Sequence, residues 1–295
     1  MLDGQVAVIT VAGRGLGRAY ALAYAGEGAR VVVNDLDATS AASVVEEIAA
    51  LGGAAVANDD TVAEPSGARR MVATGVERFG RIDVMITNAG ADHRGPALDL
   101  EPHDWEFTLR THLFGSIHCS VEAGRVMRDQ RGGGAIVNVC SAAFYVATPT
   151  LAPYGVAKGG IYGLMRSLAG ELAPLGISVN AVAPPLTATA PALAFVDSLA
   201  ERGLPGEQVE AMRSSMAQPD DVATIAVFLA TPEGRRLSGH LFTMTKDELT
   251  DFGPPDERRL VRAPGERWTL EDLAAAVWSL EGHAGQHDAG RRTPP

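Results

Sequence analysis

Cysteine is scarce in this chain, and the two cysteines form no recognisable pattern. Cys119 and Cys140 are the only ones among 295 residues, and their separation matches neither a metal-ligand motif nor a redox pair. The seven histidines show no ligand spacing either. A disulfide framework and a zinc module are therefore excluded, and we expect no bound metal.

Apolar runs long enough for a membrane and clusters of basic residues are also missing. No run approaches the ~20 apolar residues of a membrane-spanning helix, and the first residues, MLDGQVAVIT, do not resemble a signal peptide. The 36 acidic residues outnumber the 25 basic ones, and the resulting net charge of −11 repels nucleic acid. We expect a soluble, cytoplasmic protein that binds small molecules rather than membranes or nucleic acid.

The chain does contain an alternation of short, β-branched apolar segments with longer segments of helical periodicity. Nearly continuous apolar character is typical of strands covered on both faces. The predicted strands are residues 6–10, 30–35, 54–58, 82–87, 135–140, 178–182 and 240–245. The predicted helices are residues 16–28, 38–51, 65–79, 103–129, 154–173 and 219–230. This alternation predicts an α/β fold, a three-layer, doubly wound parallel sheet of the Rossmann-like type with about seven strands.

Two segments interrupt the alternation. Residues 184–217 contain four prolines and an apolar stretch, and an excursion of this length predicts an apolar substrate lid. We assign residues 1–246, including this lid, to one domain. Residues 247–295 are predicted to form a C-terminal extension with one amphipathic helix capped by Thr269 and a mobile tail from Gly282. Whether this extension covers its own site or that of a neighbour stays open.

A glycine-rich turn follows the first predicted strand and opens the first helix. Its glycines allow the backbone to approach a pyrophosphate, and the helix N-terminus adds unpaired N–H groups. Asp35 lies 18 residues beyond Gly17, where a carboxylate binds an adenosine ribose. Arg14 could accept a 2′-phosphate, but Asp35 would repel it, so NAD(H) is favoured over NADP. The cofactor-binding candidates in this region are Gly13, Arg14, Gly15, Leu16, Gly17 and Asp35.

The turn TVAGRGLG at residues 10–17 resembles the TGxxxGxG motif of the short-chain dehydrogenase/reductase family, and the resemblance covers about residues 4–246. Val11 stands where the family has its first glycine. A β-branched side chain resists positive φ and crowds the adenosine side of the turn. At about 1–3 kcal/mol, this crowding lowers cofactor affinity roughly 5- to 150-fold. The residues leave open whether NAD(H) binding is weakened, altered or lost.

Ser141, Tyr154 and Lys158 form the candidate catalytic set. Tyr154 and Lys158 share one helix face, and an ammonium near a phenol lowers the pKa of the phenol so that it can exchange a proton with substrate. Lysine is rare here: Lys158 and Lys246 are the only two among 25 basic residues. Ser141 ends a predicted strand 13 residues before Tyr154, where its hydroxyl can hold the substrate oxygen.

The spacing Ser–x12–Tyr–x3–Lys is similar to that of the same family. The resemblance implies that Ser141 orients the substrate, Tyr154 is the acid/base, and Lys158 binds the nicotinamide ribose and tunes Tyr154. His112 replaces an asparagine that supports a proton relay in the family. An imidazole can relay protons, but a single helical histidine is often structural, and both roles stay open.

Three further segments resemble cofactor contacts of the family. The sequence TNAG at residues 87–90 is similar to NNAG, residues 60–62 match an adenine-contacting Asp-Val pair with Thr61 in place of the aspartate, and NAVAPP at residues 180–185 is similar to NxxxPG. Pro185 replaces the glycine of that last motif, and Thr187 or Thr189 could supply a hydroxyl to the carboxamide. These segments extend the cofactor-binding candidates to Asp60, Thr61, Val62, Asn88, Ala89, Gly90, Tyr154, Lys158, Pro184 and Thr187.

The leading hypothesis is an NAD(H)-dependent oxidoreductase that interconverts a secondary alcohol and a ketone on a mid-sized apolar metabolite. The alternative is a non-redox enzyme of the same fold, a cyclase, dehydratase or isomerase that uses Tyr154 and Ser141 for acid/base chemistry; a non-catalytic binding protein is a third. The resemblance also implies a homodimer or homotetramer through the helices at 103–129 and 154–173. The arginine bias suggests a GC-rich genome, with secondary metabolism as a candidate setting.

Overall fold

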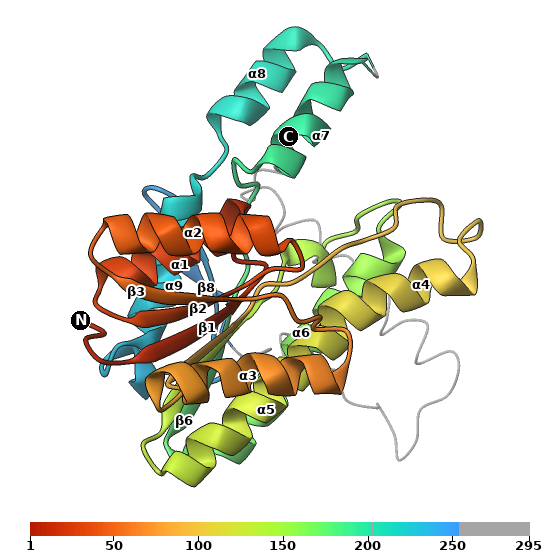
Figure 1. Cartoon of the computed structure of the whole chain (residues 1–295). Coiled ribbons are helices and arrows are strands. Elements are labelled where there is room, and N and C mark those ends of the chain that lie inside the picture. Colours follow the sequence, from red (N-terminus) through yellow and green to blue (C-terminus); the bar gives the residue numbers. More distant parts are fainter. Residues whose placement is uncertain (202, 254–295) are drawn as a thin grey trace, which may run out of the picture. The chain divides into compact units, whose positions relative to one another are not determined.

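The computed structural model describes residues 1–201 and 203–253, which build one eight-stranded sheet (Figure 1). The strand order is β3-β2-β1-β4-β5-β6-β7-β8, and the first seven are parallel. These seven are β1 Val6–Thr10, β2 Arg30–Asn34, β3 Ala54–Asn58, β4 Val84–Thr87, β5 Gly134–Val139, β6 Ile177–Val182 and β7 Leu241–Met244. The predicted α/β fold and its doubly wound parallel sheet are therefore confirmed.

The helices cover both faces of the sheet (Figure 1). On one face lie α1 Gly15–Gly26, α2 Ala38–Ala50 and α9 Pro219–Ala230. On the other lie α3 Pro65–Phe79, α5 Gly115–Gln130 and α6 Ala152–Leu172, and α4 Pro102–Leu109 packs beside α6. Strand side chains alternate between these layers: Ala7 and Ile9 point into the first, Val6 and Val8 into the second.

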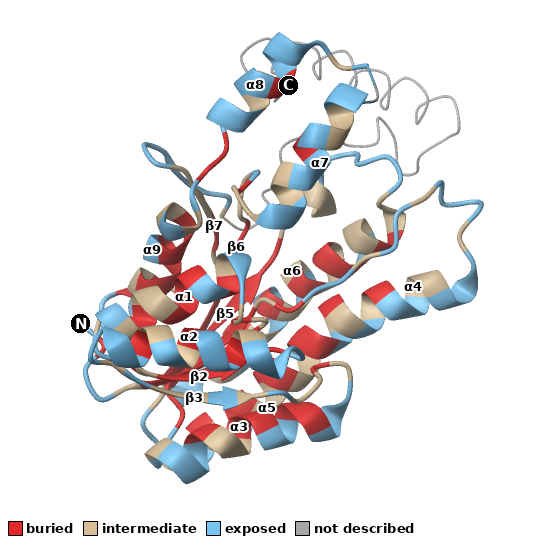
Figure 2. Ribbon diagram, turned by 45° about the horizontal axis from the view of Figure 1, so that its top comes forward, coloured by how far each residue is buried: buried red, intermediate tan, exposed pale blue. Residues whose placement is uncertain are grey.

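The strand order reverses between β1 and β4, and this reversal positions the site. In an open parallel sheet the loops at such a point diverge to opposite faces and leave a crevice at the carboxyl ends of the strands. The turn after β1, the loop after β4 and the loop after β5 all meet there. Figure 2 shows that the strands behind this crevice are buried, whereas much of the surface of α7 and α8 is exposed.

Three features differ from the sequence-based expectation. An eighth strand, β8 Leu249–Asp251, pairs antiparallel with β7; three exposed residues are too short for an apolar pattern to reveal. Strand β3 is the sheet edge and is only partly buried, so it is not covered on both faces. The predicted helix 103–129 consists of α4, a π-helical turn Arg110–Phe114, and α5.

The segment 184–217, predicted as a lid, forms two helices, α7 Ala190–Glu201 and α8 Gly206–Ser214. They share a small apolar cluster of Val196, Val209 and Met216. The helix and the tail predicted after residue 254 lie outside the described residues.

None of the described helices combines the length and the apolar character needed to cross a membrane. Within residues 1–201 and 203–253 no group of His, Cys, Asp and Glu side chains is arranged to hold a metal ion.

Candidate active site

Ser141 stands directly after β5, at the carboxyl edge of the sheet. Its backbone is extended, and its hydroxyl accepts a hydrogen bond from the Ala143 N–H at 3.2 Å, which caps a short 3₁₀ turn, Ala142–Phe144. The hydroxyl also hydrogen-bonds the phenol of Tyr154, an interaction that favours the phenolate form. The predicted serine and tyrosine are thus brought together.

Lys158 lies one turn beyond Tyr154 on α6 and is almost fully buried. Its ammonium donates to the Val139 carbonyl at 2.7 Å and lies 5.4 Å from the centre of the Tyr154 ring. Burial lowers the pKa of Lys158 from 10.5 to about 8. A lysine with this pKa is mostly charged at neutral pH, but it readily loses its proton above that.

The pKa of Tyr154 differs from the expected lowering. Burial raises it, the Ser141 hydrogen bond lowers it, and the charges of Asp92 and Arg94 act in opposite directions. Burial is the largest of these contributions, and it outweighs the Ser141 hydrogen bond, so the pKa of Tyr154 lies above its ordinary value. The phenol is therefore held in its protonated form, ready to donate.

His112 lies in the π-helical turn between α4 and α5, and π-helical turns are frequent at functional sites. Its buried ring meets the Tyr154 ring edge-on, with 5.1 Å between the centroids. Neither ring nitrogen has a hydrogen-bond partner among the described residues. Burial, with a smaller contribution from the Lys158 charge, lowers the pKa of His112 to about 2, so the imidazole is neutral.

Gly90 makes room for this histidine. A Cβ atom at Gly90 would lie 1.9 Å from Cε1 of His112, which no side chain could tolerate. The glycine of the TNAG segment therefore leaves space for the His112 ring, and its role as a cofactor contact stays a prediction. The sequence signal for this contact is the combination of a glycine at position 90 with a bulky ring at position 112.

The turn after β1 has the geometry of an anion-binding helix start. Arg14 is the N-cap of α1, and its side chain makes no hydrogen bond to the helix. The first N–H groups of α1 can therefore donate hydrogen bonds to a ligand. A Cβ at Gly17 would lie 1.9 Å from the Val11 carbonyl oxygen. Val11 itself has φ +49°, in the left-handed region that β-branched residues avoid.

Asp35 is buried, and its carboxylate holds the turn in place. One oxygen accepts from the Gly13 N–H and the other from the Asp37 N–H, both at 3.1 Å. Each oxygen retains a lone pair for a ribose hydroxyl. These residues fit an adenosine cofactor: a close backbone approach, a helix N-terminus and an oriented carboxylate.

Thr10, which the sequence patterns did not single out, connects β1 to the loop after β4. Its hydroxyl accepts from the N–H groups of Asn88 and Ala89, both at 2.8 Å, and the Asn88 amide donates to the Thr10 carbonyl at 3.1 Å. Asn88 and Ala89 thus support the turn rather than stand free beside it.

The residues after β3 are engaged with their neighbours. Asp60 accepts from Arg70 at 2.6 Å and from Asn58 at 2.8 Å, and Thr61 accepts from the Ala63 N–H at 3.2 Å. Val62 is buried, with its carbonyl 3.1 Å from His118. Val62 and the Asp60 carboxylate therefore lie within the structural framework of this loop.

The loop after β6 leads from the sheet into the lid. Pro184 is partly buried, and the Thr187 hydroxyl donates to the Pro185 carbonyl at 2.8 Å. Thr189 lies beside the glycine-rich turn after β1: a Cβ at Gly15 would be 3.5 Å from its methyl group. Of the two threonines considered, Thr189 is the one that the structure brings to the turn.

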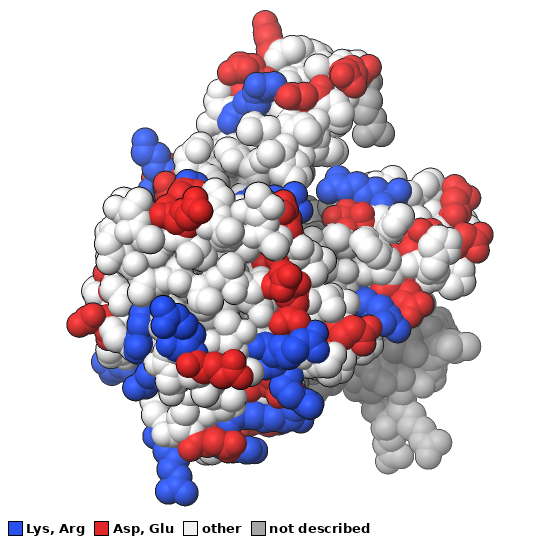
Figure 3. Space-filling view, in the orientation of Figure 1, with Lys and Arg blue, Asp and Glu red and all other residues white. Residues whose placement is uncertain are grey.

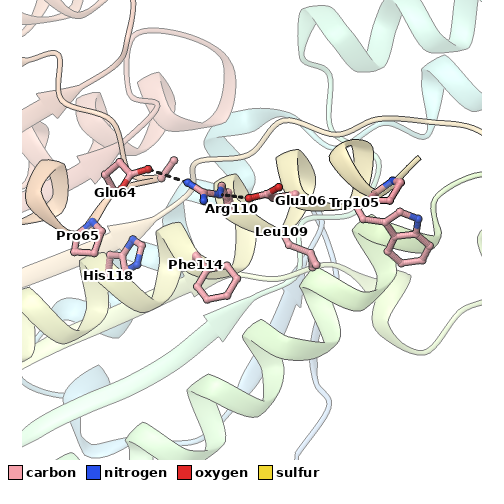
Figure 4. A pocket seen from close by; sticks show the side chains of 10 residues that line it. Glu64, Pro65, Trp105, Glu106, Leu109, Arg110, Phe114 and His118 are labelled. Carbon is pink, nitrogen blue, oxygen red and sulfur yellow. Dashed lines mark hydrogen bonds and ion pairs between the residues drawn. The ribbon is translucent and has the colours of Figure 1, made fainter. Parts of the chain in front are cut away.

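A surface cavity has a lining that includes neither Ser141 nor Tyr154. It has a volume of about 540 Å³ and lies between the start of α3 and the outer side of α4, the π-helical turn and α5 (Figure 4). Trp105, Leu109 and Phe114 give it an apolar wall, and Arg110 bridges Glu64 and Glu106, each at 2.9 Å. This cavity is an outer-surface feature of the helices expected to mediate assembly.

The chain is similar to proteins of known class. The family model for short chain dehydrogenases matches residues 5–197. A 3-oxoacyl-[acyl-carrier-protein] reductase of Synechocystis sp. is 36% identical over 253 residues, which are 82% of this chain and 96% of that protein.

Solved structures agree. The crystal structure of a short chain dehydrogenase from Mycobacterium avium superimposes with a TM-score of 0.82 and 31% identity, over 100% of this chain and 97% of that one. A 7α-hydroxysteroid dehydrogenase in complex with NADH and 7-oxo glycochenodeoxycholic acid gives a TM-score of 0.74 and 29% identity, over 83% and 94% of the two chains.

Proposed function

The chain belongs to the short-chain dehydrogenase/reductase family, and we propose that it interconverts a secondary alcohol and a ketone on a mid-sized apolar metabolite with NAD(H). The observation that carries this proposal is the convergence of Ser141, Tyr154 and Lys158 at the carboxyl edge of the sheet, beside the turn after β1. The non-redox alternative rests on Val11 and Pro185, which replace two motif glycines. The relatives described above are dehydrogenases and reductases, and they favour the redox proposal.

The side chains divide the work in the direction of reduction. The Ser141 hydroxyl holds the substrate carbonyl oxygen, and Tyr154 donates its proton to that oxygen. The bound dinucleotide supplies or accepts the hydride. Lys158 stabilises the phenolate that results, because its ammonium lies against the same ring and is anchored by the Val139 carbonyl.

His112 is proposed to return a proton toward this site. Its neutral imidazole has one nitrogen that donates and one that accepts, and neither is satisfied by the described protein groups. Two water molecules, one at each ring nitrogen, would satisfy both nitrogens and form a relay. The alternative, a purely structural histidine, leaves two buried polar atoms unexplained.

The proposed preference for NAD(H) rests on Asp35. A buried carboxylate fixed by two backbone N–H groups favours ribose hydroxyls and opposes a 2′-phosphate. The NADH in the 7α-hydroxysteroid dehydrogenase structure supports the same choice. The 7-oxo bile acid beside it supports a mid-sized apolar ketone as the substrate class.

We propose that the chain forms a homo-oligomer through the helices at 103–129 and 154–173. Phe107, Phe114 and Val156 expose 46%, 46% and 53% of their surface there, and the cavity shown in Figure 4 lies on the same outer side. Large apolar side chains that are exposed on these helices would be covered by association with a second copy. Phe114→Asp should lower the oligomeric state measured by light scattering.

Calorimetric titration with NAD, NADH and NADPH tests the proposed function. We expect micromolar binding of NAD and NADH, weaker binding of NADPH, and tighter binding of NADH by Val11→Gly. If folded wild-type protein binds no dinucleotide up to millimolar concentration, the oxidoreductase proposal fails. If only Val11→Gly binds, the valine has abolished cofactor binding in the wild type.

A further inference from the structure

The loop between β4 and α4 holds a cation, Arg94, on a rigid support. The His93 N–H donates at 3.2 Å to the hydroxyl of Thr108, a wholly buried residue of α4. The Gly95 N–H donates at 3.0 Å to the Thr150 carbonyl, four residues before Tyr154. The backbone on both sides of Arg94 is therefore tied to the elements that lead to His112 and Tyr154.

The side chain of Arg94 is also held, on one edge and one face. Its Nε donates to Asp92 at 2.9 Å, and its guanidinium lies 5.5 Å from the centre of the Phe195 ring on lid helix α7. Its side chain is 53% exposed. Among the described residues no acceptor faces the terminal Nη groups, so this edge of the guanidinium is available to a ligand.

The chain segment that carries this cation is fastened to the segment before Tyr154, since the Gly95 N–H bonds the Thr150 carbonyl. The charges of Asp92 and Arg94 both act on the phenol of Tyr154, and Asp92 also acts on Lys158. Coulomb interactions of this kind are appreciable only between neighbours, because solvent screens more distant charges. Figure 3 shows basic side chains at the gap between the lid helices and the loop that leads into α4.

We propose that Arg94 binds an anionic group of the substrate, a carboxylate or a phosphate, while the apolar body of the substrate lies beneath the lid. The proposal rests on the proposed reductase function and adds an oxyanion to its substrate class. The two Nη groups match two oxygens of such an anion. The Nε of Arg94 remains bonded to Asp92, and one face of the guanidinium remains against Phe195. The anion can therefore bind the Nη groups without moving Asp92 or Phe195.

Three ketones that share one aromatic body test this proposal: para-acetylbenzoate, its uncharged methyl ester and para-acetylphenyl phosphate. We expect wild-type enzyme with NADH to reduce at least one charged ketone with a higher kcat/KM than the ester. Arg94→Met should lower kcat/KM for that charged ketone by about 10- to 100-fold, because a charge-assisted hydrogen-bonded pair is lost, and should lower kcat/KM for the ester by a clearly smaller factor. The ketone with the larger loss shows whether carboxylate or phosphate is the preferred anion.

Arg128→Met is the matched control, since Arg128 is an exposed arginine paired with Asp129 at the far end of α5. It should leave all three ketones unaffected. If Arg94→Met reduces the rates for charged and uncharged ketones equally, Arg94 merely fastens the lid through Phe195, and the proposal is overturned. An unchanged profile in Arg94→Met also overturns it.

Binding separates this proposal from the proposed function. Calorimetric titration of wild type and Arg94→Met with para-acetylbenzoate, its methyl ester and para-acetylphenyl phosphate needs no turnover. If no ketone is reduced, but at least one charged ligand binds wild type more tightly than the ester and loses this advantage in Arg94→Met, the anion site stands and the reductase assignment fails. If no charged ligand is preferred in rate or in binding, the anion site fails.

Discussion

Two regions of the molecule are destabilised in different ways: the turn after β1, and the catalytic cluster, which consists of Ser141, Tyr154, Lys158 and His112. In the turn, Val11 occupies a left-handed conformation, but the nearby polar groups are satisfied: Asp35 accepts from two N–H groups, and the Thr10 hydroxyl from two more. In the catalytic cluster none of the four residues Ser141, Tyr154, Lys158 and His112 has a positive φ. However, neither ring nitrogen of His112 has a hydrogen-bond partner among the described residues, and Lys158 is a buried cation.

This difference follows from what each region does. A turn that binds a dinucleotide must present backbone N–H groups in a fixed array, and a strained backbone conformation can hold them in that array. A proton-transfer site needs groups whose protonation changes easily, and burial of unsatisfied groups is the means. Mutations should therefore relieve conformational strain in the first region and electrostatic cost in the second.

Tyr154→Phe should have the largest effect and should confine it to chemistry. Removal of the phenolic hydroxyl removes the proton donor, and we expect kcat for ketone reduction to fall about 10²- to 10⁴-fold. Dinucleotide binding, measured by calorimetry, should change less than about threefold. A variant with full activity would overturn the role assigned to Tyr154.

Lys158→Met should separate activity from stability. Because burial holds the pKa of Lys158 at about 8, below its ordinary 10.5, the buried ammonium destabilises the fold most at pH values below 8, and this cost fades as the pH rises toward 10.5. After the loss of the Val139 hydrogen bond is subtracted, we expect a gain of about 1–2 kcal/mol in the free energy of unfolding at neutral pH.

Urea denaturation of Lys158→Met at neutral pH and at about pH 10 checks this expectation. The gain over wild type should shrink at the higher pH, while kcat stays far below wild type throughout. A variant that is less stable than wild type at neutral pH would show that the catalytic cluster does not carry this electrostatic cost.

His112→Asn should change the acid side of the stability profile. The pKa of His112 is lowered from 6.5 to about 2, so below pH 6.5 the unfolded chain takes up a proton that the folded chain refuses. Stability is therefore lost as the pH falls, by about 2 kcal/mol at pH 5. The asparagine variant should lack this loss in denaturation series from neutral pH downward. His103→Asn, at an exposed position, should keep the wild-type slope; identical slopes in all three proteins would contradict the burial of His112.

Sequence patterns anticipated the layers of the fold because apolar periodicity reports burial directly. The seven parallel strands and most helices follow from it, as does the meeting of Ser141 with Tyr154, which sit at a strand end and on the next helix. Strand β8 was missed because three exposed residues have no periodicity. The pKa of Tyr154 was predicted in the wrong direction because burial of the phenol raises it, and residue spacing does not show how deeply a side chain is buried.

Contacts between loops were the least accessible to sequence reasoning. The fit of Gly90 against His112 and of Arg94 against Phe195 joins segments that are 22 and 101 residues apart. Each contact depends on how two loops leave the same edge of the sheet. By contrast, the positive φ of Val11 could be predicted from the sequence, because the motif itself defines the backbone conformation of the turn.

Val11→Gly should have the smallest effect on stability. The test is whether this substitution raises or lowers the free energy of unfolding. Relief of a left-handed valine, worth about 1–3 kcal/mol, is partly offset by the larger backbone entropy of glycine in the unfolded chain, about 0.4–1 kcal/mol. We expect the free energy of unfolding to rise by about 1 kcal/mol in urea denaturation. Val76→Gly, in the regular helix α3, is the matched control and should lose about 0.5–1 kcal/mol. If both substitutions destabilise equally, the turn stores no conformational strain, and the contrast between the two regions disappears.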